Sequence, residues 1–238
     1  MSLPPPLSAV FLDVGGTILR PSISVGSAYS SALEFTGVTL DPEDLDCAFM
    51  KEFNNRKQVA RTSRGTAYGS THEEAKTFWH SVFMATLPSE VKAHPQVGKA
   101  FEEVYRYFGE GQAWALFPDT MPFLEELRRH QVPVIIVSNW DARLPQLLDA
   151  LGITPWVQRV IGSFQVGSEK PAPEIFVAAL ESLKVPASFQ QVLHVGDNDA
   201  EDGEGARALG IPFVRVDRAS KNPSDSVVPS LLDILKRL

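Results

Sequence analysis

The sequence of 238 residues contains a single cysteine, Cys47, and can therefore form no intrachain disulfide bond. A chain without disulfides is compatible with a reducing compartment. Cys47 lies near apolar positions of the helix-like segment PEDLDCAFMKEF. We therefore interpret it as a structural residue rather than a nucleophile.

Long apolar runs and a surplus of positive charge are also missing. No run approaches the ~20 residues of a membrane-spanning helix, and the N-terminal MSLPPPLSAV lacks the charged and apolar regions of a secretory signal. Lysine and arginine number 22 against 29 aspartates and glutamates, and the resulting net charge of −7 repels polyanions. These absences predict a cytoplasmic protein that binds neither membranes nor nucleic acid.

What the sequence does contain is an alternation of two kinds of segment. Short runs rich in valine and isoleucine are typical of buried parallel strands, namely Ala9 to Val14, VPVIIVSN, RVIGSF, QVLHVGD and IPFVRVD. Segments with helical periodicity lie between them, namely TMPFLEELRRHQ, ARLPQLLDALG, EIFVAALESLK and AEDGEGARALG. This alternation predicts an α/β fold with a doubly wound parallel sheet.

A helical insertion separates the first predicted strand from the second. Residues 21–114 contain little that resembles a strand, and apolar residues recur at helical spacing, as at Leu45 and Phe49. We therefore predict two domains, a core of residues 1–20 and 115–238 and an all-helical domain of residues 21–114.

Two segments allow more than one interpretation. RTSRGTAYGST is either a solvated connector or a loop that contacts substrate through Arg61 and Arg64. The C-terminal VVPSLLDILKRL is typical of an amphipathic helix, which could pack on the core or form a dimer contact. The sequence is therefore compatible with a monomer or a homodimer.

Polar residues stand where the predicted strands end or in the loops that follow. They are Asp13, Ser138, Asn139, Lys170, Asp197 and Asp202. Each alone has an ordinary explanation as a turn, cap or solvated residue. Ligands of an open parallel sheet bind at the carboxyl ends of its strands, so we interpret the joint occurrence as a site.

These residue types favour phosphate chemistry. Asp13 and Asp197, from neighbouring predicted strands, form a hard oxygen site that suits Mg²⁺. Lys170 on the far side of that site, together with the Ser138 hydroxyl, can hold phosphate oxygens. Asp13 is the nearby nucleophile, and its attack would form an aspartyl-phosphate that water hydrolyses. The residues predict Mg²⁺-dependent hydrolysis of a small phosphorylated molecule.

At these residues the sequence resembles the haloacid dehalogenase superfamily. The four motifs of that superfamily are similar to DVGGT from Asp13 to Thr17, to Ser138, to Lys170, and to Gly196 with Asp197 and Asp202. The segments DVGGTIL, SNWDARL, KPAPEIF and HVGDN are most similar to the subgroup of haloacid dehalogenase-like hydrolase domain-containing protein 3.

The resemblance covers the whole chain and implies a Rossmann-like core with a helical cap between the first two motifs. It implies catalytic roles for Asp13, Ser138 and Lys170. The implied phosphate ligands are Gly16, Thr17, Ser138, Asn139 and Lys170. The implied metal ligands are Asp13, Gly15, Asp197 and Asp202.

Gly15 stands where phosphatases of this superfamily carry a second aspartate. The resemblance implies that glycine keeps the backbone carbonyl for the metal but loses the carboxylate that acts as general acid and base. General acid–base catalysis contributes ~10²- to 10⁴-fold in rate, and its loss matters least for acyl and aryl phosphates. His194, Asp141 and Asp199 are candidate replacements. Strand alternation favours a buried structural role for His194, and the two aspartates equally fit turns or caps.

Other functions stay open. A protein that binds phosphate and metal without turnover would also tolerate Gly15. Hydrolysis of a carbon–halogen or carbon–phosphorus bond is a further alternative. The dehalogenases that the chain resembles have tyrosine at the position of Gly15 and use no metal. The phosphonate-cleaving enzymes have alanine there and need a cap lysine, for which Lys51 and Lys57 are candidates by location.

Overall fold

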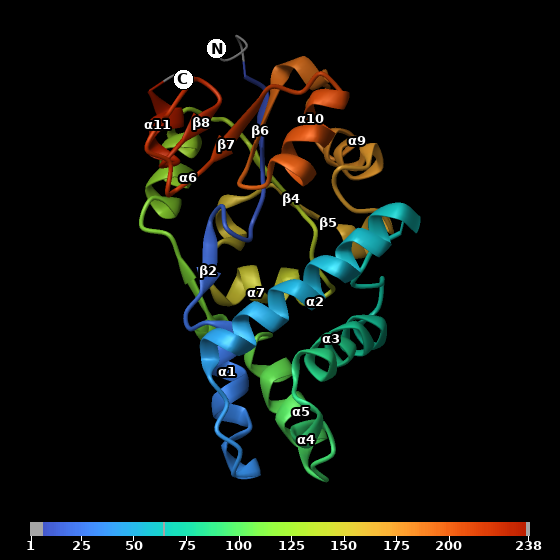
Figure 1. The fold of residues 1–238 in the computed structure, drawn as a ribbon. Helices are drawn as coiled ribbons and strands as arrows, with labels where there is room; N and C mark the ends of the chain where they lie inside the picture. Colours follow the sequence, from blue (N-terminus) through green and yellow to red (C-terminus); the bar gives the residue numbers. More distant parts are fainter. Residues whose placement is uncertain (1–6, 64, 237–238) are drawn as a thin grey trace.

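A six-stranded parallel sheet forms the centre of the computed structural model, which describes residues 7–63 and 65–236 (Figure 1). The strand order is β5–β4–β1–β6–β7–β8. The strands are β1 (Ala9–Leu12), β4 (Val134–Ser138), β5 (Arg159–Gly162), β6 (Val192–Gly196), β7 (Phe213–Val216) and β8 (Val227–Val228). β1 therefore lies in the middle of the sheet, between β4 and β6.

Helices cover both faces of the sheet because successive side chains of a strand point to opposite sides. Val10 and Leu12 of β1 belong to a buried cluster with Phe123 on one face, and Phe11 belongs to a second cluster with Phe176 on the other. The helices are α6 (Thr120–Arg129), α7 (Leu144–Ala150), α8 (Ser163–Val166), α9 (Pro173–Glu181), α10 (Glu204–Ala208) and α11 (Leu232–Leu235). The predicted doubly wound α/β fold is confirmed.

The helical insertion lies below the sheet in Figure 1, and we call it the cap. It contains α1 (Val25–Ala32), α2 (Pro42–Ser63), α3 (His72–Thr86), α4 (Ser89–Lys92) and α5 (Val97–Tyr107). The chain enters and leaves it through a two-stranded antiparallel ribbon of β2 (Leu19–Pro21) and β3 (Trp114–Leu116). Its core includes the buried side chains of Leu45, Phe83 and Phe101.

The N-terminus of α3 is fixed by a capping box. The Thr71 hydroxyl accepts a hydrogen bond from the Glu74 amide, and the Glu74 carboxylate accepts one from the Thr71 amide. This reciprocal pair satisfies two amides that the first turn of α3 leaves without partners.

No helix within residues 7–63 and 65–236 is long and apolar enough to cross a membrane.

Some predictions about the cap need correction. Cys47 is exposed on α2, so its interpretation as a residue packed among apolar positions is wrong. The apolar stripe of α2 instead passes through Leu45 and Phe49, and Cys47 falls outside it. Helix α2 also runs to Ser63, into the segment predicted as a loop. The side chains of Arg61 and Arg64 lie outside the part of the chain that the structure describes.

Candidate active site

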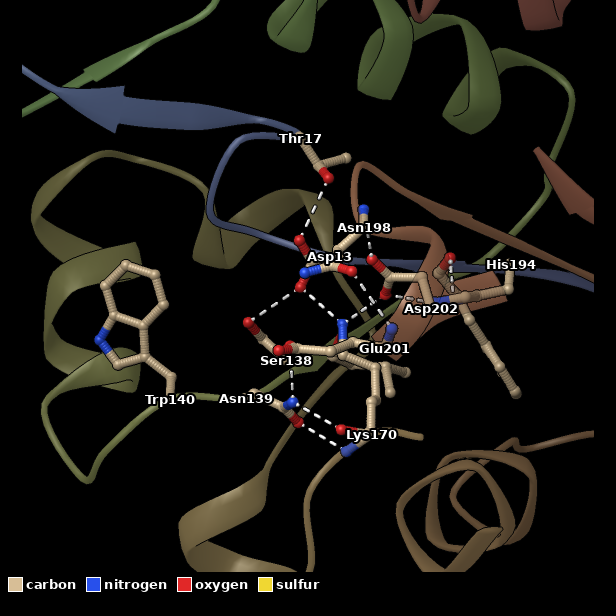
Figure 2. Close-up of polar contacts among 12 residues, drawn as sticks. Asp13, Thr17, Ser138, Asn139, Trp140, Lys170, His194, Asn198, Glu201 and Asp202 are labelled. Carbon is tan, nitrogen blue, oxygen red and sulfur yellow. Dashed lines mark hydrogen bonds and ion pairs between the residues drawn. The ribbon is translucent and has the colours of Figure 1, made fainter. Parts of the chain in front are cut away.

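The residues at the predicted strand ends gather at one edge of the sheet (Figure 2). Because β1 pairs with β4 and with β6, Asp13 directly after β1 lies between the end of β4 and the end of β6. Ser138 is the last residue of β4, and Asp197 directly follows β6. Lys170 enters the same place from the loop before α9.

Lys170 lies buried between two carboxylates, with only 1% of its surface exposed. Its Nζ donates hydrogen bonds to Oδ1 of Asp13 and to Oδ1 of Asp202, both 2.6 Å away, and to the Val137 carbonyl at 2.9 Å. Burial alone would lower the pKa of Lys170, but the two carboxylates outweigh it and raise the pKa. Lys170 was predicted on the far side of the carboxylates. It contacts Asp13 and Asp202 directly, because a buried ammonium group needs charged partners.

Asp13 is fixed by three donors. Oδ1 accepts hydrogen bonds from Lys170 and from the Ser138 hydroxyl at 3.1 Å, and Oδ2 accepts one from the Thr17 hydroxyl at 3.1 Å. Burial raises the pKa of Asp13, whereas the charge of Lys170 opposes that rise. The lysine thus favours the ionised carboxylate that a nucleophile requires.

His194 supports Asp202 from inside the sheet. Its Nε2 lies 2.8 Å from Oδ1 of Asp202, and its Nδ1 lies 3.2 Å from the Phe11 carbonyl oxygen. The side chain is fully buried, and both ring nitrogens have protein partners. This placement agrees with a structural role, the reading that strand alternation favoured, and the imidazole positions Asp202.

The three carboxylates of the site fit a divalent cation. Asp13, Asp197 and Asp202 offer oxygen atoms that lie within 4.8 Å of one another, against the single ammonium group of Lys170. Burial and the charges of Asp13 and Asp202 raise the pKa of Asp197 to about 7. All-oxygen ligands and unbalanced negative charge are the chemistry that suits Mg²⁺. Asp13 and Asp202 each accept hydrogen bonds through both oxygens, so a bound cation would share these oxygens with the existing donors.

Glycine is required next to two of these carboxylates. A Cβ on Gly16 would lie 2.2 Å from Oδ2 of Asp197, and the φ of Gly16 is +76°. A Cβ on Gly196 would lie 2.2 Å from Cγ of Asp202. Both distances are far below van der Waals contact, so any larger residue at either position would displace a carboxylate.

Asn139 contacts the loop of Lys170. Its Nδ2 donates to the Lys170 carbonyl oxygen at 2.9 Å, and its Oδ1 accepts from the Lys170 amide at 2.7 Å. Nδ2 also donates to Oε2 of Glu201 at 2.9 Å. These contacts show that Asn139 orients the backbone that carries the lysine.

Trp140 occupies the space beside Gly15. A Cβ on Gly15 would lie 3.3 Å from Cζ3 of Trp140, and the indole packs against Trp114 with ring centroids 5.0 Å apart. Sequence reasoning missed Trp140. The available signal was its position directly after Ser138 and Asn139, at the end of a predicted strand.

The two candidate replacement aspartates are held in ion pairs. Asp141 accepts hydrogen bonds from Arg143 at 2.7 and 3.0 Å and from Trp79 Nε1 at 2.8 Å. Burial alone would raise the pKa of Asp141, but Arg143 outweighs it and lowers the pKa. A hydrogen bond from Arg207 likewise lowers the pKa of Asp199. Both carboxylates are therefore ionised at neutral pH and have no proton to donate.

A cavity of about 330 Å³ connects these residues with the cap. At one end it is lined by Asp13, Gly15 and Ser138. Elsewhere its walls include the aromatic side chains of Tyr29, Phe49, Phe53, Tyr68, Trp79 and Tyr105. The size falls at the lower end of the range for small-molecule pockets.

Polar contacts join the cap to the core at this cavity or beside it, and three sets of them involve sequence neighbours of site residues. Lys57 pairs with Glu201, Trp79 donates to Asp141, and Glu169 accepts hydrogen bonds from Thr66 and Ala67. Each core partner stands next to a residue of the site in the sequence, because Glu201 precedes Asp202, Asp141 follows Trp140 and Glu169 precedes Lys170.

The sequence is similar to those of known hydrolases. Residues 7–210 match the family model described as haloacid dehalogenase-like hydrolase. The chain is 28% identical over 240 residues to haloacid dehalogenase-like hydrolase domain-containing protein 3 from Danio rerio, covering 98% of this chain and 97% of the relative. It is 30% identical over 182 residues to ribulose-1,5-bisphosphate 5-phosphatase from Halopiger xanaduensis, covering 75% and 72%.

The fold is also similar to that of an L-2-haloacid dehalogenase from Xanthobacter autotrophicus. The TM-score is 0.70 at 21% identity, and the match covers 97% of each chain. At that identity the similarity concerns the fold alone.

Proposed function

The chain belongs to the family of haloacid dehalogenase-like hydrolases, and from that premise we propose that it is a Mg²⁺-dependent phosphatase with Asp13 as its nucleophile. The observation that carries the proposal is the setting of Asp13. This carboxylate is held by Lys170, Ser138 and Thr17 and opens into a cavity that Asp197 also lines. A relative named as a phosphatase, at 30% identity, supports the same reaction class.

Mg²⁺ held by Asp13, Asp197, Asp202 and the carbonyl of Gly15 would neutralise the negative charge of the site and of the phosphate. An oxygen of Asp13 attacks phosphorus, and the bond from phosphorus to the leaving-group oxygen breaks with its electron pair. Lys170 balances the charge around Asp13, and the Ser138 hydroxyl and the amide of Thr17 bind phosphate oxygens, whereas the Gly16 amide donates to the Leu19 carbonyl oxygen. Water then attacks phosphorus and releases inorganic phosphate and the carboxylate of Asp13.

Gly15 restricts which leaving groups the site can expel. No side chain at position 15 donates a proton, and Asp141 and Asp199 are ionised in their ion pairs. The leaving oxygen must therefore depart as an anion or take its proton from water. We accordingly propose that acyl and aryl phosphates are hydrolysed much faster than sugar phosphates, by the ~10²- to 10⁴-fold that an acid–base group contributes.

We also propose the bounds of the two domains, the cellular location and the binding partners. Residues 21–114 form the cap and residues 1–20 with 115–238 the catalytic core. The protein is cytoplasmic, acts on a small molecule as a monomer or homodimer, and binds no nucleic acid.

Cleavage of a carbon–phosphorus bond through a cap lysine is less well supported. Lys57 lines the cavity but pairs with Glu201, and Lys51 is exposed and does not line it. A Schiff base needs a neutral amine, which an ion pair disfavours.

Hydrolysis of acetyl phosphate and para-nitrophenyl phosphate, with and without Mg²⁺, tests the proposal. We expect metal-dependent turnover that Asp13→Asn reduces by at least ~10³-fold, because an amide is not a nucleophile. Asp149→Asn, an exposed aspartate of α7, is the matched control and should keep full activity. Phosphate binding without turnover in the native protein would reject the phosphatase and favour a binding role.

A further inference from the structure

Aromatic side chains line the cavity both beside the nucleophile and in the cap, and together we call them the aromatic wall. Trp140 stands next to Gly15, and the following residue, Asp141, accepts a hydrogen bond from the indole of Trp79. Trp79 belongs to α3, so this bond fixes the aromatic side chains of the cap to the edge of the phosphate site. Trp140 and Trp79 both line the same cavity as Asp13.

The cap part of this wall is a stack of flat rings. Phe53 stacks on Trp79 with centroids 5.7 Å apart and planes 11° apart, and Tyr68 stacks on Trp79 at 5.6 Å and 25°. Phe53 is half-buried, and all three rings line the cavity. The indole N–H of Trp79 is bound to Asp141, so the part of the ring that lines the cavity presents carbon atoms rather than an unpaired donor.

The positively charged side chains of the cavity wall away from the phosphate site are already paired. Lys57 pairs with Glu201, and Arg143 pairs with Asp141. Among the described residues that line the cavity away from the phosphate site, these are the positively charged side chains. A substrate with a second phosphate or a carboxylate would have to break one of these pairs to find a counter-charge.

We propose that the leaving group is a flat aromatic ring bearing a phenol-type oxygen, bound by Phe53, Tyr68, Trp79 and Trp140. The proposal rests on the phosphatase function above and names its substrate class, an aryl phosphate monoester. The aromatic wall and the missing acid at position 15 both favour an aryl leaving group. A phenolate leaves without the proton that Gly15 cannot supply, and its ring buries apolar area against the aromatic wall.

The reaction balances without a further reagent. The bond between phosphorus and the phenolic oxygen breaks with its electron pair, and the bond between phosphorus and Asp13 forms. The phenolate then takes a proton from water, and the resulting aspartyl-phosphate is hydrolysed by water to inorganic phosphate.

Binding and turnover test the proposal separately. In the presence of Mg²⁺, the inert Asp13→Asn protein should bind 1-naphthyl phosphate more tightly than ribose 5-phosphate or inorganic phosphate, as measured by calorimetry. We expect the preference over inorganic phosphate to be on the order of 10- to 100-fold, the amount that burial of one ring contributes. The native enzyme should also hydrolyse 1-naphthyl phosphate with a higher kcat/KM than ribose 5-phosphate.

Substitutions at two positions in the wall locate the effect. Phe53→Leu, introduced into the Asp13→Asn protein, should weaken 1-naphthyl phosphate about 10-fold and leave inorganic phosphate unchanged. Phe35→Leu removes an exposed aromatic ring that does not line the cavity, and it should change neither affinity. Trp79→Phe keeps a ring at the position and should lose less affinity than Trp79→Leu.

Different measurements would reject the phosphatase proposal and the aryl phosphate proposal. If acetyl phosphate is hydrolysed but ribose 5-phosphate binds as tightly as 1-naphthyl phosphate, the aryl assignment is wrong and the phosphatase stands. Equal weakening of both ligands by Phe53→Leu would also overturn it. If nothing is turned over, the phosphatase fails, and the calorimetric preference alone then decides whether the wall recognises an aryl phosphate.

Discussion

At the scale of single residues, Gly15 and Trp140 determine what the site cannot do. The backbone of Gly15 has no positive φ, so its conformation would admit another residue. Trp140 is what limits the space, because its Cζ3 would lie 3.3 Å from a Cβ at position 15. A carboxylate placed there would extend beyond that Cβ toward the indole. The two residues therefore act together, and a test that changes Gly15 alone is incomplete.

We expect Gly15→Asp alone to increase hydrolysis of ribose 5-phosphate by less than about 10-fold, because Trp140 hinders the new side chain. Gly15→Asp combined with Trp140→Ala should increase it by ~10²-fold or more, within the range of general acid–base catalysis. Steady-state kinetics of the native protein, both single variants and the double variant give a double-mutant cycle. Trp140→Ala alone is the control and should give no gain. A full gain from Gly15→Asp alone would show that the indole moves aside at little cost.

The sequence predicted which residues meet at the site but not how each is used. Asp13, Ser138 and Asp197 end local apolar runs, and parallel pairing brings such ends to one edge. The direct contact of Lys170 with two carboxylates depends on the path of the loop before α9, which no periodicity encodes. The contact of Trp140 with Gly15 is likewise a matter of packing across chain segments.

At the scale of secondary-structure elements, the length of each strand determined whether the sequence predicted it. The strands β1, β4, β5, β6 and β7 are four or five residues long, and each was recognisable as an apolar run. The strands β2, β3 and β8 have two or three residues and were missed, because alternation needs at least four residues to be visible. The missed pair β2 and β3 forms the ribbon at which the cap joins the core.

The loop before α3 is held to the core by one carboxylate. Oε1 of Glu169 accepts hydrogen bonds from the Thr66 hydroxyl at 2.9 Å and from the Ala67 amide at 2.6 Å. Oε2 of Glu169 is buried without a hydrogen-bond partner among the described residues. An amide nitrogen in place of that second oxygen would therefore lose no existing bond.

We expect Glu169→Ala to loosen this loop and Glu169→Gln largely to preserve it, since glutamine keeps an acceptor oxygen. Hydrogen bonds to a charged group contribute about 1.5–3 kcal/mol, so Glu169→Ala should speed amide exchange at Ala67 by 10-fold or more and raise KM. Hydrogen exchange with mass spectrometry and steady-state kinetics measure the two effects. Equal exchange rates in the alanine and glutamine variants would mean that the carboxylate does not hold the loop.

At the scale of the whole molecule, Asp119 joins segments that are far apart in the chain. Its carboxylate accepts two hydrogen bonds from Arg218, both 3.0 Å, one from the Ser230 hydroxyl at 2.8 Å and one from the Leu231 amide at 2.9 Å. Arg218 also donates to the Thr17 carbonyl oxygen at 2.7 Å. This network connects the segment after β1, the segment before α6 and the C-terminal part of the chain, and so bears on the stability of the entire core.

Asp119→Ala should therefore lower the free energy of unfolding by about 2–4 kcal/mol at pH 7, because Arg218 loses its carboxylate partner and the buried Leu231 amide loses its acceptor. Burial alone would raise the pKa of Asp119, but the hydrogen bonds from Arg218, Ser230 and Leu231 outweigh it and lower the pKa below 3.8. A carboxylate with a lowered pKa in the folded state stabilises above the unfolded-state value of 3.8, and this contribution is lost as the pH falls through the folded-state value. Urea unfolding followed by circular dichroism should thus show that the free energy of unfolding of Asp119→Ala lies below that of the native protein by a constant amount from pH 5 to 7. This difference should become smaller below pH 3.8. Asp233→Ala, which removes an ion pair with an exposed lysine, is the control and should cost less than about 1 kcal/mol. A deficit of the same size at pH 3 and at pH 7 in Asp119→Ala would assign the effect to lost packing instead of the charged network.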